Sequence, residues 1–135
     1  MTQHTLQELV ESFALFDSWE DRYRYLIDLG GRLPPMDNAL KTDESFVRGC
    51  TSKVWLVVEK RGEKLHFIAD SDAVIVKGLI YLLLVAYQDK PAGDIANIDI
   101  ESAFEQIGLH QHLSPNRRNG FFAMVERIRA LAALA

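Results

Sequence analysis

The chain has one cysteine, Cys50, and the residues around it are typical of a reactive thiol. Gly49 precedes it, and a glycine lets another molecule approach the backbone closely. Arg48 and Lys53 place a positive charge on each side of the thiol, and positive charge favours the nucleophilic thiolate. Two hydroxyl residues follow the cysteine, Thr51 and Ser52. These residue types predict sulfur chemistry at Cys50 rather than an inert place in the core.

The cysteine count limits the kinds of site that the chain can form. A single cysteine excludes a disulfide within the chain. It also excludes a cysteine-rich zinc site or an iron–sulfur cluster held by one chain alone. A metal shared between two chains stays open, as does a homodimer.

Length and composition predict one globular domain over residues 1–135. A chain of 135 residues suits a single hydrophobic core, and 48% hydrophobic with 25% charged residues is ordinary for such a domain. The net charge of -4, from 15 basic and 19 acidic residues, argues against a nucleic-acid binder, which needs a basic face.

No membrane or export segment is predicted. Residues 1–4 do not begin a basic region followed by an apolar run, so no signal peptide is expected. Residues 73–87 are almost continuously apolar but shorter than the roughly 20 residues that span a bilayer. We therefore interpret them as a buried helix and expect a cytoplasmic protein.

Two helices are predicted before the cysteine. Apolar residues recur at helical spacing from Leu6 to Phe16. Ser18 is a helix cap for a second helix, with Asp21 three residues later as in a capping box. Gly30 and the next glycine end this helix, and residues 32–44 are expected to form a loop.

Residues 53–70 have the pattern of a β-hairpin. Residues 53–59 are rich in valine and other strand formers, residues 60–63 form a turn, and apolar and polar residues alternate over 65–70. Phe46 and Val47 are expected to add a third strand, which would put Cys50 in the turn between that strand and the hairpin. Exposed turns of this kind often carry function.

The C-terminal half is predicted to be helical. Asp70, Ser71 and Asp72 are expected to cap the buried helix, which ends near residue 88. Shorter helices should begin at Pro91 and Asp99, and the last helix should begin at Ser114 with proline in its first turn. The order predicts the α+β class, with a small antiparallel three-stranded sheet packed by helices on one face.

Four segments together resemble the SufE family of iron–sulfur cluster assembly. They are residues 19–30 (WEDRYRYLIDLG), 49–55 (GCTSKVW), 70–79 (DSDAVIVKGL) and 113–120 (LSPNRRNG). They occur in the family's order and extend over nearly the whole chain. One position departs from the family, which usually has asparagine five residues before the cysteine, where this chain has Ser45.

The resemblance implies a sulfur acceptor that shares its fold with scaffold proteins of the IscU type. Such a protein takes persulfide sulfur from a cysteine desulfurase of the SufS or CsdA type, stimulates that enzyme and passes sulfur to a scaffold complex of the SufBCD type. It is not itself a self-sufficient enzyme, and it needs no cofactor, because the pyridoxal phosphate belongs to the desulfurase. Cys50 is then the acceptor.

The residues suit this transfer chemistry. A thiolate attacks one sulfur of a sulfur–sulfur bond and another thiolate leaves. A second thiol would attack the new persulfide and release its sulfur as sulfide, so a single cysteine suits a carrier better than a dithiol redox enzyme. Trp55 is a further candidate, either as a core residue or in a pocket that shelters the persulfide.

Asp72 and Arg117 occupy family motif positions near the ends of two helices. One interpretation is that they hold or release the Cys50 loop by charge and hydrogen bonds. The other is that Asp72 is a helix N-cap and Arg117 a first-turn surface residue. The sequence leaves both open.

The principal alternative function is a cysteine-dependent enzyme or a peroxide sensor that uses Cys50. A Cys/His pair would need one of the chain's histidines close to the thiol. His66 falls in a predicted strand, and His110 and His112 fall in a predicted turn. Their spacing gives no evidence for such a pair.

Overall fold

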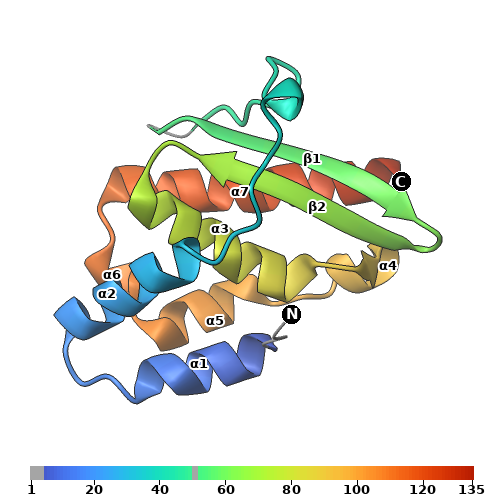
Figure 1. Ribbon diagram of the computed structural model, residues 1–135. Helices are drawn as coiled ribbons and strands as arrows, with labels where there is room; N and C mark the ends of the chain where they lie inside the picture. Colours follow the sequence, from blue (N-terminus) through green and yellow to red (C-terminus); the bar gives the residue numbers. More distant parts are fainter. Residues whose placement is uncertain (1–4, 50–51) are drawn as a thin grey trace.

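The computed structural model describes residues 5–49 and 52–135, and Figure 1 shows helices packed against one side of a β-hairpin. The hairpin is the main part of a three-stranded antiparallel sheet with the order β1-β2-β3. The elements are α1 (Leu6–Ala14), α2 (Trp19–Gly30), the 3-10 turn η1 (Asn38–Leu40), β1 (Val54–Arg61), β2 (Lys64–Ser71), α3 (Val74–Tyr87), β3 (Lys90–Pro91), α4 (Ala92–Ile95), α5 (Ile100–Ile107), α6 (Leu109–His112) and α7 (Pro115–Leu134). The predicted α+β class is confirmed.

The hairpin forms because its strands alternate between a buried and a half-exposed face. Val54 pairs with Ser71, and Arg61 pairs with Lys64 at the other end of the ladder. Gly62 makes the turn at a φ of 63°, a conformation that favours glycine. The buried face of β2 consists of Leu65, Phe67, Ala69 and Ser71.

The third strand differs from the prediction. The sheet is completed by the two-residue β3, which pairs with the start of β2. Phe46 does pair with β1, but only as an isolated bridge to Trp55. A bridge forms there because the chain reaches the edge of β1 for one rung only.

The helix N-caps predicted at Ser18 and Ser114 are confirmed. Ser18 accepts a hydrogen bond from the Asp21 N–H at the start of α2, and Ser114 accepts one from the Arg117 N–H at the start of α7. Gly108 ends α5 in the left-handed conformation, with φ 90°. These local signals fix where helices begin and end before any tertiary contact is considered.

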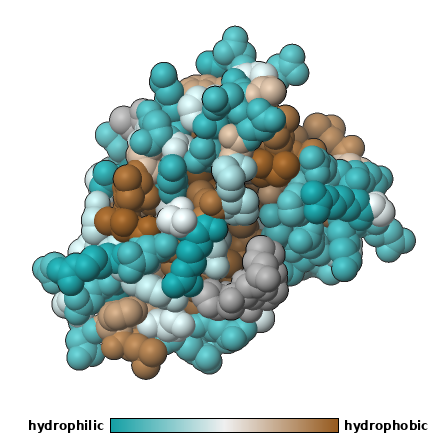
Figure 2. Space-filling model, in the orientation of Figure 1, coloured by the Kyte–Doolittle hydropathy of each residue, from teal (hydrophilic) through white to brown (hydrophobic). Residues whose placement is uncertain are grey.

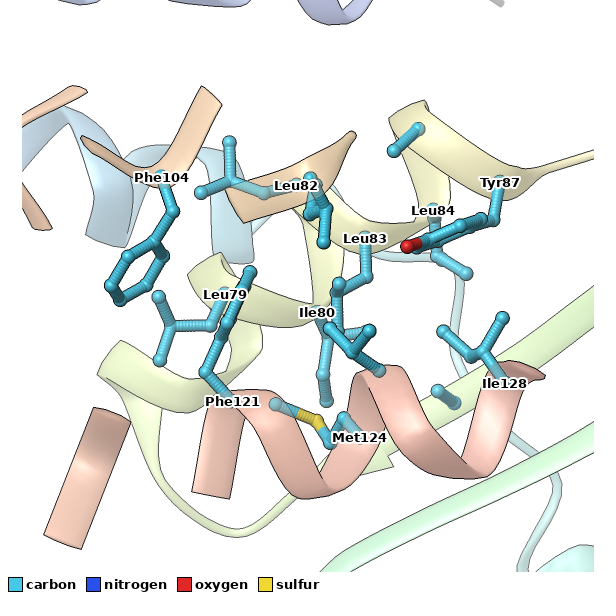
Figure 3. Packing of buried hydrophobic residues seen from close by; sticks show 14 of the residues in the cluster. Leu79, Ile80, Leu82, Leu83, Leu84, Tyr87, Phe104, Phe121, Met124 and Ile128 are labelled. Atoms are coloured by element: carbon cyan, nitrogen blue, oxygen red, sulfur yellow. The ribbon is translucent and has the colours of Figure 1, made fainter. Parts of the chain in front are cut away.

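The core lies between α3, α7 and the hairpin. Figure 3 shows side chains of α3, among them Leu79 and Ile80, above Phe121, Met124 and Ile128 of α7. All five are at most 3% exposed. On the side seen in Figure 2, the surface is mostly hydrophilic, with separate small apolar patches.

Two glycines allow α2 and α3 to pack closely. A Cβ placed on Gly30 would come within 2.7 Å of the Gly78 nitrogen, and one placed on Gly78 would overlap the Leu26 carbonyl oxygen. Gly78 therefore interrupts the apolar run for a steric reason, since any side chain there would force the two helices apart.

We predict that Gly78→Ala lowers the free energy of unfolding by about 3 kcal/mol or more, because backbone atoms of α2 cannot move aside. Gly93→Ala is the matched control. Gly93 is exposed in α4 and has nothing within 4 Å of an added Cβ, so that variant should match or slightly exceed the parent. Urea denaturation measures both, and equal stability of the two variants would contradict the close packing.

Candidate functional site

The segment that contains Cys50 connects two paired stretches of chain. The Val47 N–H donates to the Val54 carbonyl at 2.8 Å, and the Leu56 N–H donates to the Ser45 carbonyl at 2.8 Å. The connection between these pairs is therefore short. Cys50 and Thr51 lie outside the described residues, so the site is defined here by the residues on either side of them.

Ser45 stabilises the chain just before this connection. Its side chain is buried, donates to the Leu40 carbonyl at 2.6 Å and accepts from the Thr42 N–H at 3.0 Å. The Ser45 N–H in turn donates to the Thr42 hydroxyl at 3.2 Å. The serine that replaces the family's usual asparagine is thus fully hydrogen-bonded in a closed turn.

Gly49 combines a left-handed backbone with a close contact to α7. Its φ is 92°, and an added Cβ would lie 3.3 Å from the Cβ of Ala123. That distance is tighter than an ordinary van der Waals contact. The absence of a side chain at Gly49 therefore lets the backbone before the cysteine lie close to α7.

Asp72 is bonded to the chain just after the cysteine. Its carboxylate accepts from the Lys53 N–H at 3.0 Å, and the Asp72 N–H donates to the Lys53 carbonyl at 3.2 Å. The N-cap of α3 is Ala73, and no side chain caps that helix. The cap interpretation of Asp72 is therefore wrong, because its carboxylate instead bonds to Lys53 across the open end of the hairpin.

Asp70 fixes a second segment at the same end of the hairpin. Its carboxylate contacts the Lys41 ammonium at 3.0 Å and the Lys77 ammonium at 3.8 Å. Burial acts to raise the pKa of Asp70, but hydrogen bonds from Lys41 and the Ser71 N–H, with the charges of both lysines, lower it overall. Lys41 directly follows η1 in the long connection between α2 and β1, and the first part of that connection passes across the hairpin in Figure 1.

A small pocket lies between the Cys50 segment, α3 and α7. Its volume is about 20 Å³, enough for one water-sized group and far below the roughly 300–1,000 Å³ of ordinary ligand pockets. Its lining is mainly apolar and consists of Ser52, Val76, Leu79, Asn116, Arg117, Gly120, Phe121 and Met124. Ser52 and Arg117, two of the predicted site residues, therefore lie on the same small pocket.

Trp55 does not line this pocket. Its ring packs edge-on against Phe46 at 6.2 Å between centroids, and the Lys41 ammonium lies 5.2 Å from its centre. Trp55 is opposite Asp70 in the strand register and has the reverse orientation to the buried Val54 and Leu56. It therefore lies on the outer face of the sheet and is neither a core residue nor part of the pocket.

Two of the described histidines, His66 and His112, have contacts away from the Cys50 segment. The His66 Nδ1 lies 2.8 Å from the Asp89 carboxylate, and His66 pairs with Glu59, five residues along β1 from Val54. At about 3.3 Å per residue this separation is about 17 Å. The His112 ring stacks on Trp19 of α2 at 4.6 Å. These contacts give no support to a Cys/His pair.

Arg48 and Lys53 are exposed on the two sides of the cysteine. Among the residues that the structure describes, neither side chain has a hydrogen-bond or ion-pair partner. Arg117 is also exposed, and its N–H is used in capping α7. Arg48, Lys53 and Arg117 thus carry positive charges near the Cys50 segment. None of the three forms an ion pair with a residue that the structure describes.

The described part of the chain has neither a cluster of metal-binding side chains nor a helix that could span a membrane. Within residues 5–49 and 52–135, no group of three or more histidine, cysteine, aspartate or glutamate residues is placed to hold a metal ion. No described helix combines the length and apolar character needed to cross a bilayer.

The sequence did not identify the contribution of α7. Ala123 contacts Gly49, and the Arg127 guanidinium donates to the Glu44 carbonyl at 2.5 Å. The available signal was the spacing of Gly120, Ala123 and Arg127, which places them on one face of the helix beside the apolar face.

The fold of the described residues is shared with another protein of known structure. A hypothetical protein of Thermus thermophilus, known from its solution structure, matches with a TM-score of 0.79 at 20% identity, covering 100% of this chain and 98% of that one. At this identity the match supports the fold alone. The class is therefore an α+β protein with a helix-backed hairpin.

Sequence comparisons place the chain more narrowly. A family model described as "SufE: Fe-S metabolism associated domain" matches residues 7–132. A SufE-like protein of Rhizobium etli is 44% identical over 129 residues, covering 93% of this chain and 87% of the relative. Another, of Rhizobium meliloti, is 43% identical over 132 residues, covering 95% and 94%. The chain belongs to the SufE family, whose domain is associated with iron–sulfur metabolism.

We predict that Asp72→Ala raises the alkylation rate of Cys50 by about threefold to tenfold, because one hydrogen bond to the Lys53 N–H is lost. Asp72→Asn keeps a side-chain oxygen acceptor and should stay close to the parent. Iodoacetamide alkylation followed by intact mass measures the rate. An unchanged rate in a folded Asp72→Ala protein would show that this bond does not hold the segment.

Asp70 should make stability depend on pH. A lowered pKa means that the stabilising contribution is present above the unfolded-state pKa of about 3.9 and is lost as the pH falls through the folded-state pKa. Asp70→Asn should therefore unfold about 1 kcal/mol more easily at pH 7, and less so below about pH 4. Urea denaturation at both pH values tests this, with Asp94→Asn, at an exposed position in α4, as the control. A difference that persists undiminished at pH 3 would contradict the assignment.

Proposed function

We propose that this protein is a sulfur acceptor that takes persulfide sulfur onto Cys50 from a cysteine desulfurase of the SufS or CsdA type. The Cys50 thiolate attacks the outer sulfur of the desulfurase persulfide. A new sulfur–sulfur bond forms at Cys50, the bond on the donor breaks, and the donor cysteine leaves as a thiolate. Electrons balance without an added oxidant or reductant.

The position of the Cys50 segment carries this proposal. Asp72 is bonded to the backbone of Lys53, and Gly49 and Ser52 lie against α7 and its small pocket. The only cysteine of the chain is therefore bracketed by residues with defined contacts, in a family associated with iron–sulfur metabolism. This arrangement supports a thiol presented by a built segment.

The pocket suits a sulfur atom better than an organic ligand. Its volume of about 20 Å³ accommodates one small group, and Met124 and Phe121 give it an apolar wall. A sulfane sulfur that points into this pocket would be protected from attack by free thiols in solution. Protection of this kind is what a carrier needs between loading and delivery.

The charged and hydroxyl residues then act on the thiol. In this proposal the charges of Arg48 and Lys53 stabilise the thiolate, and the hydroxyls of Thr51 and Ser52 are the neighbouring donors in the sequence. Arg117 acts in the same place from α7, and Asp72 holds the backbone that carries Lys53. Asp72 and Arg117 are supporting residues, and Cys50 alone exchanges sulfur.

The sulfur leaves by the reverse chemistry. A thiolate on a scaffold complex of the SufBCD type attacks the Cys50 persulfide and frees the Cys50 thiolate for another cycle. Because product sulfur is removed from the desulfurase, its turnover rises. The exchange takes place in the cytoplasm, and the pyridoxal phosphate that the overall reaction needs belongs to the desulfurase.

Incubation with a desulfurase and free cysteine, followed by intact mass under non-reducing conditions, tests the proposal. We expect the parent protein to gain the mass of one or more sulfur atoms and the Cys50→Ser variant to gain none. Dithiothreitol should remove the added mass, since it reduces a persulfide.

Two results would contradict the proposal. Absence of a sulfur adduct with desulfurases of both types would remove the acceptor role. Rapid addition of oxygen to Cys50 by low peroxide, in place of sulfur, would favour the peroxide sensor.

A further inference from the structure

The chain that leads into and out of the Cys50 connection follows α7 in the opposite direction. Glu44 contacts Arg127, Gly49 lies next to Ala123, and Ser52 shares the pocket with Gly120. As the segment proceeds from 44 to 52, its contacts on α7 move back from 127 to 120. These α7 positions are three or four residues apart and so lie on one face of the helix.

The contact at Glu44 is a hydrogen bond from a charged side chain of α7 to the backbone. The Arg127 guanidinium donates to the Glu44 carbonyl at 2.5 Å, across 83 residues of sequence. Hydrogen bonds from charged donors are among the strongest in proteins. Gly49 is placed beside Ala123, and Ser52 lines the pocket with Gly120, which gives the path of the segment along α7.

The bond between Arg127 and Glu44 lies next to the first backbone hydrogen bond between the Cys50 segment and β1. The Glu44 carbonyl is followed at once by buried Ser45, whose own carbonyl accepts from the Leu56 N–H of β1. The entry to the connection is therefore held from two sides, by α7 through Arg127 and by the edge of β1. Beyond Val47, which donates to Val54, the chain is free of the ladder and reaches Gly49.

We propose that Arg127 is a positioning residue for the chemistry of Cys50. By its hydrogen bond to the Glu44 carbonyl, it holds the chain before Cys50 against α7. Its described contact is with the Glu44 carbonyl, six residues before Cys50 in the sequence. Its effect reaches the thiol through residues 44–49, in the way that Asp72 acts through Lys53 from the other side. This inference rests on the proposed role of Cys50 as the acceptor.

The helix offers a matched control for this role. Arg118 also lies on α7 and also donates to a backbone carbonyl, that of His110, at 2.9 Å. That carbonyl belongs to α6 and not to the acceptor segment. Arg127→Met and Arg118→Met each remove one bond of the same kind, but only the first loses a contact with the chain before Cys50.

The test measures iodoacetamide alkylation of Cys50 against pH, together with hydrogen exchange of residues 44–49. We expect Arg127→Met to alkylate about threefold to tenfold faster than the parent, the population change for one lost hydrogen bond. The midpoint of the pH profile should not change, because the bond is to a carbonyl six residues before the thiol. Exchange in residues 44–49 should be faster, and Arg118→Met should behave as the parent in both measurements.

Arg127→Lys keeps a charged donor and should recover part of the parental rate and exchange. It also keeps the test decisive if the methionine variant folds poorly. A parental alkylation rate in folded Arg127→Met, a shifted pH midpoint, or an equal effect of Arg118→Met would each overturn the inference. Neither readout uses a desulfurase, so a failed sulfur-loading experiment would remove the proposed function without deciding the role of Arg127.

Discussion

The hydrogen bonds between Asp72 and Lys53 join three elements at one point, and the arrangement of the site depends on them. Asp72 comes directly after β2 and just before α3, and Lys53 comes directly before β1. Since α3 is buried along most of its length, its start cannot move without disturbing the core. The backbone that leaves the Cys50 connection is thereby attached to the most rigid part of the molecule.

The helix α7 supplies the complementary surface. Its inner residues, such as Phe121 and Met124, pack on α3 (Figure 3), while Ala123 and Arg127 face the segment that contains Cys50. One face of α7 therefore packs in the core, and the adjacent face lies beside the Cys50 segment. The described residues on both sides of Cys50 are attached to the rest of the fold, as the proposed exchange of sulfur with another protein would need.

Much of the fold could be predicted because its signals are local. The caps at Ser18 and Ser114, the alternation along β2 and the apolar run of α3 each depend on residues a few positions apart. The short strand β3 was missed because Lys90 and Pro91 have no strand pattern of their own. They form a strand only because the end of α3 brings them beside β2.

The sequence yields a prediction for the chemistry of the site, but it could not yield the contacts around it. Cys50 was identified by its neighbours in the sequence, and family resemblance pointed to Asp72 and Arg117. The partner of Asp72 is 19 residues away and that of Arg127 is 83 residues away, so no local pattern could reveal either bond. The orientation of Trp55 was also missed, because an aromatic residue in a strand suits either face until the register is known.

The most direct test of the acceptor role is its kinetic competence in a single turnover. A desulfurase loaded with one persulfide is mixed with the protein, the reaction is stopped at successive times, and the Cys50 peptide is analysed by mass spectrometry. If Cys50 is the acceptor, sulfur should appear on it at least as fast as the stimulated desulfurase turns over. Stimulation that is undiminished in Cys50→Ser, or sulfur that appears on Cys50 only after turnover is complete, would contradict it.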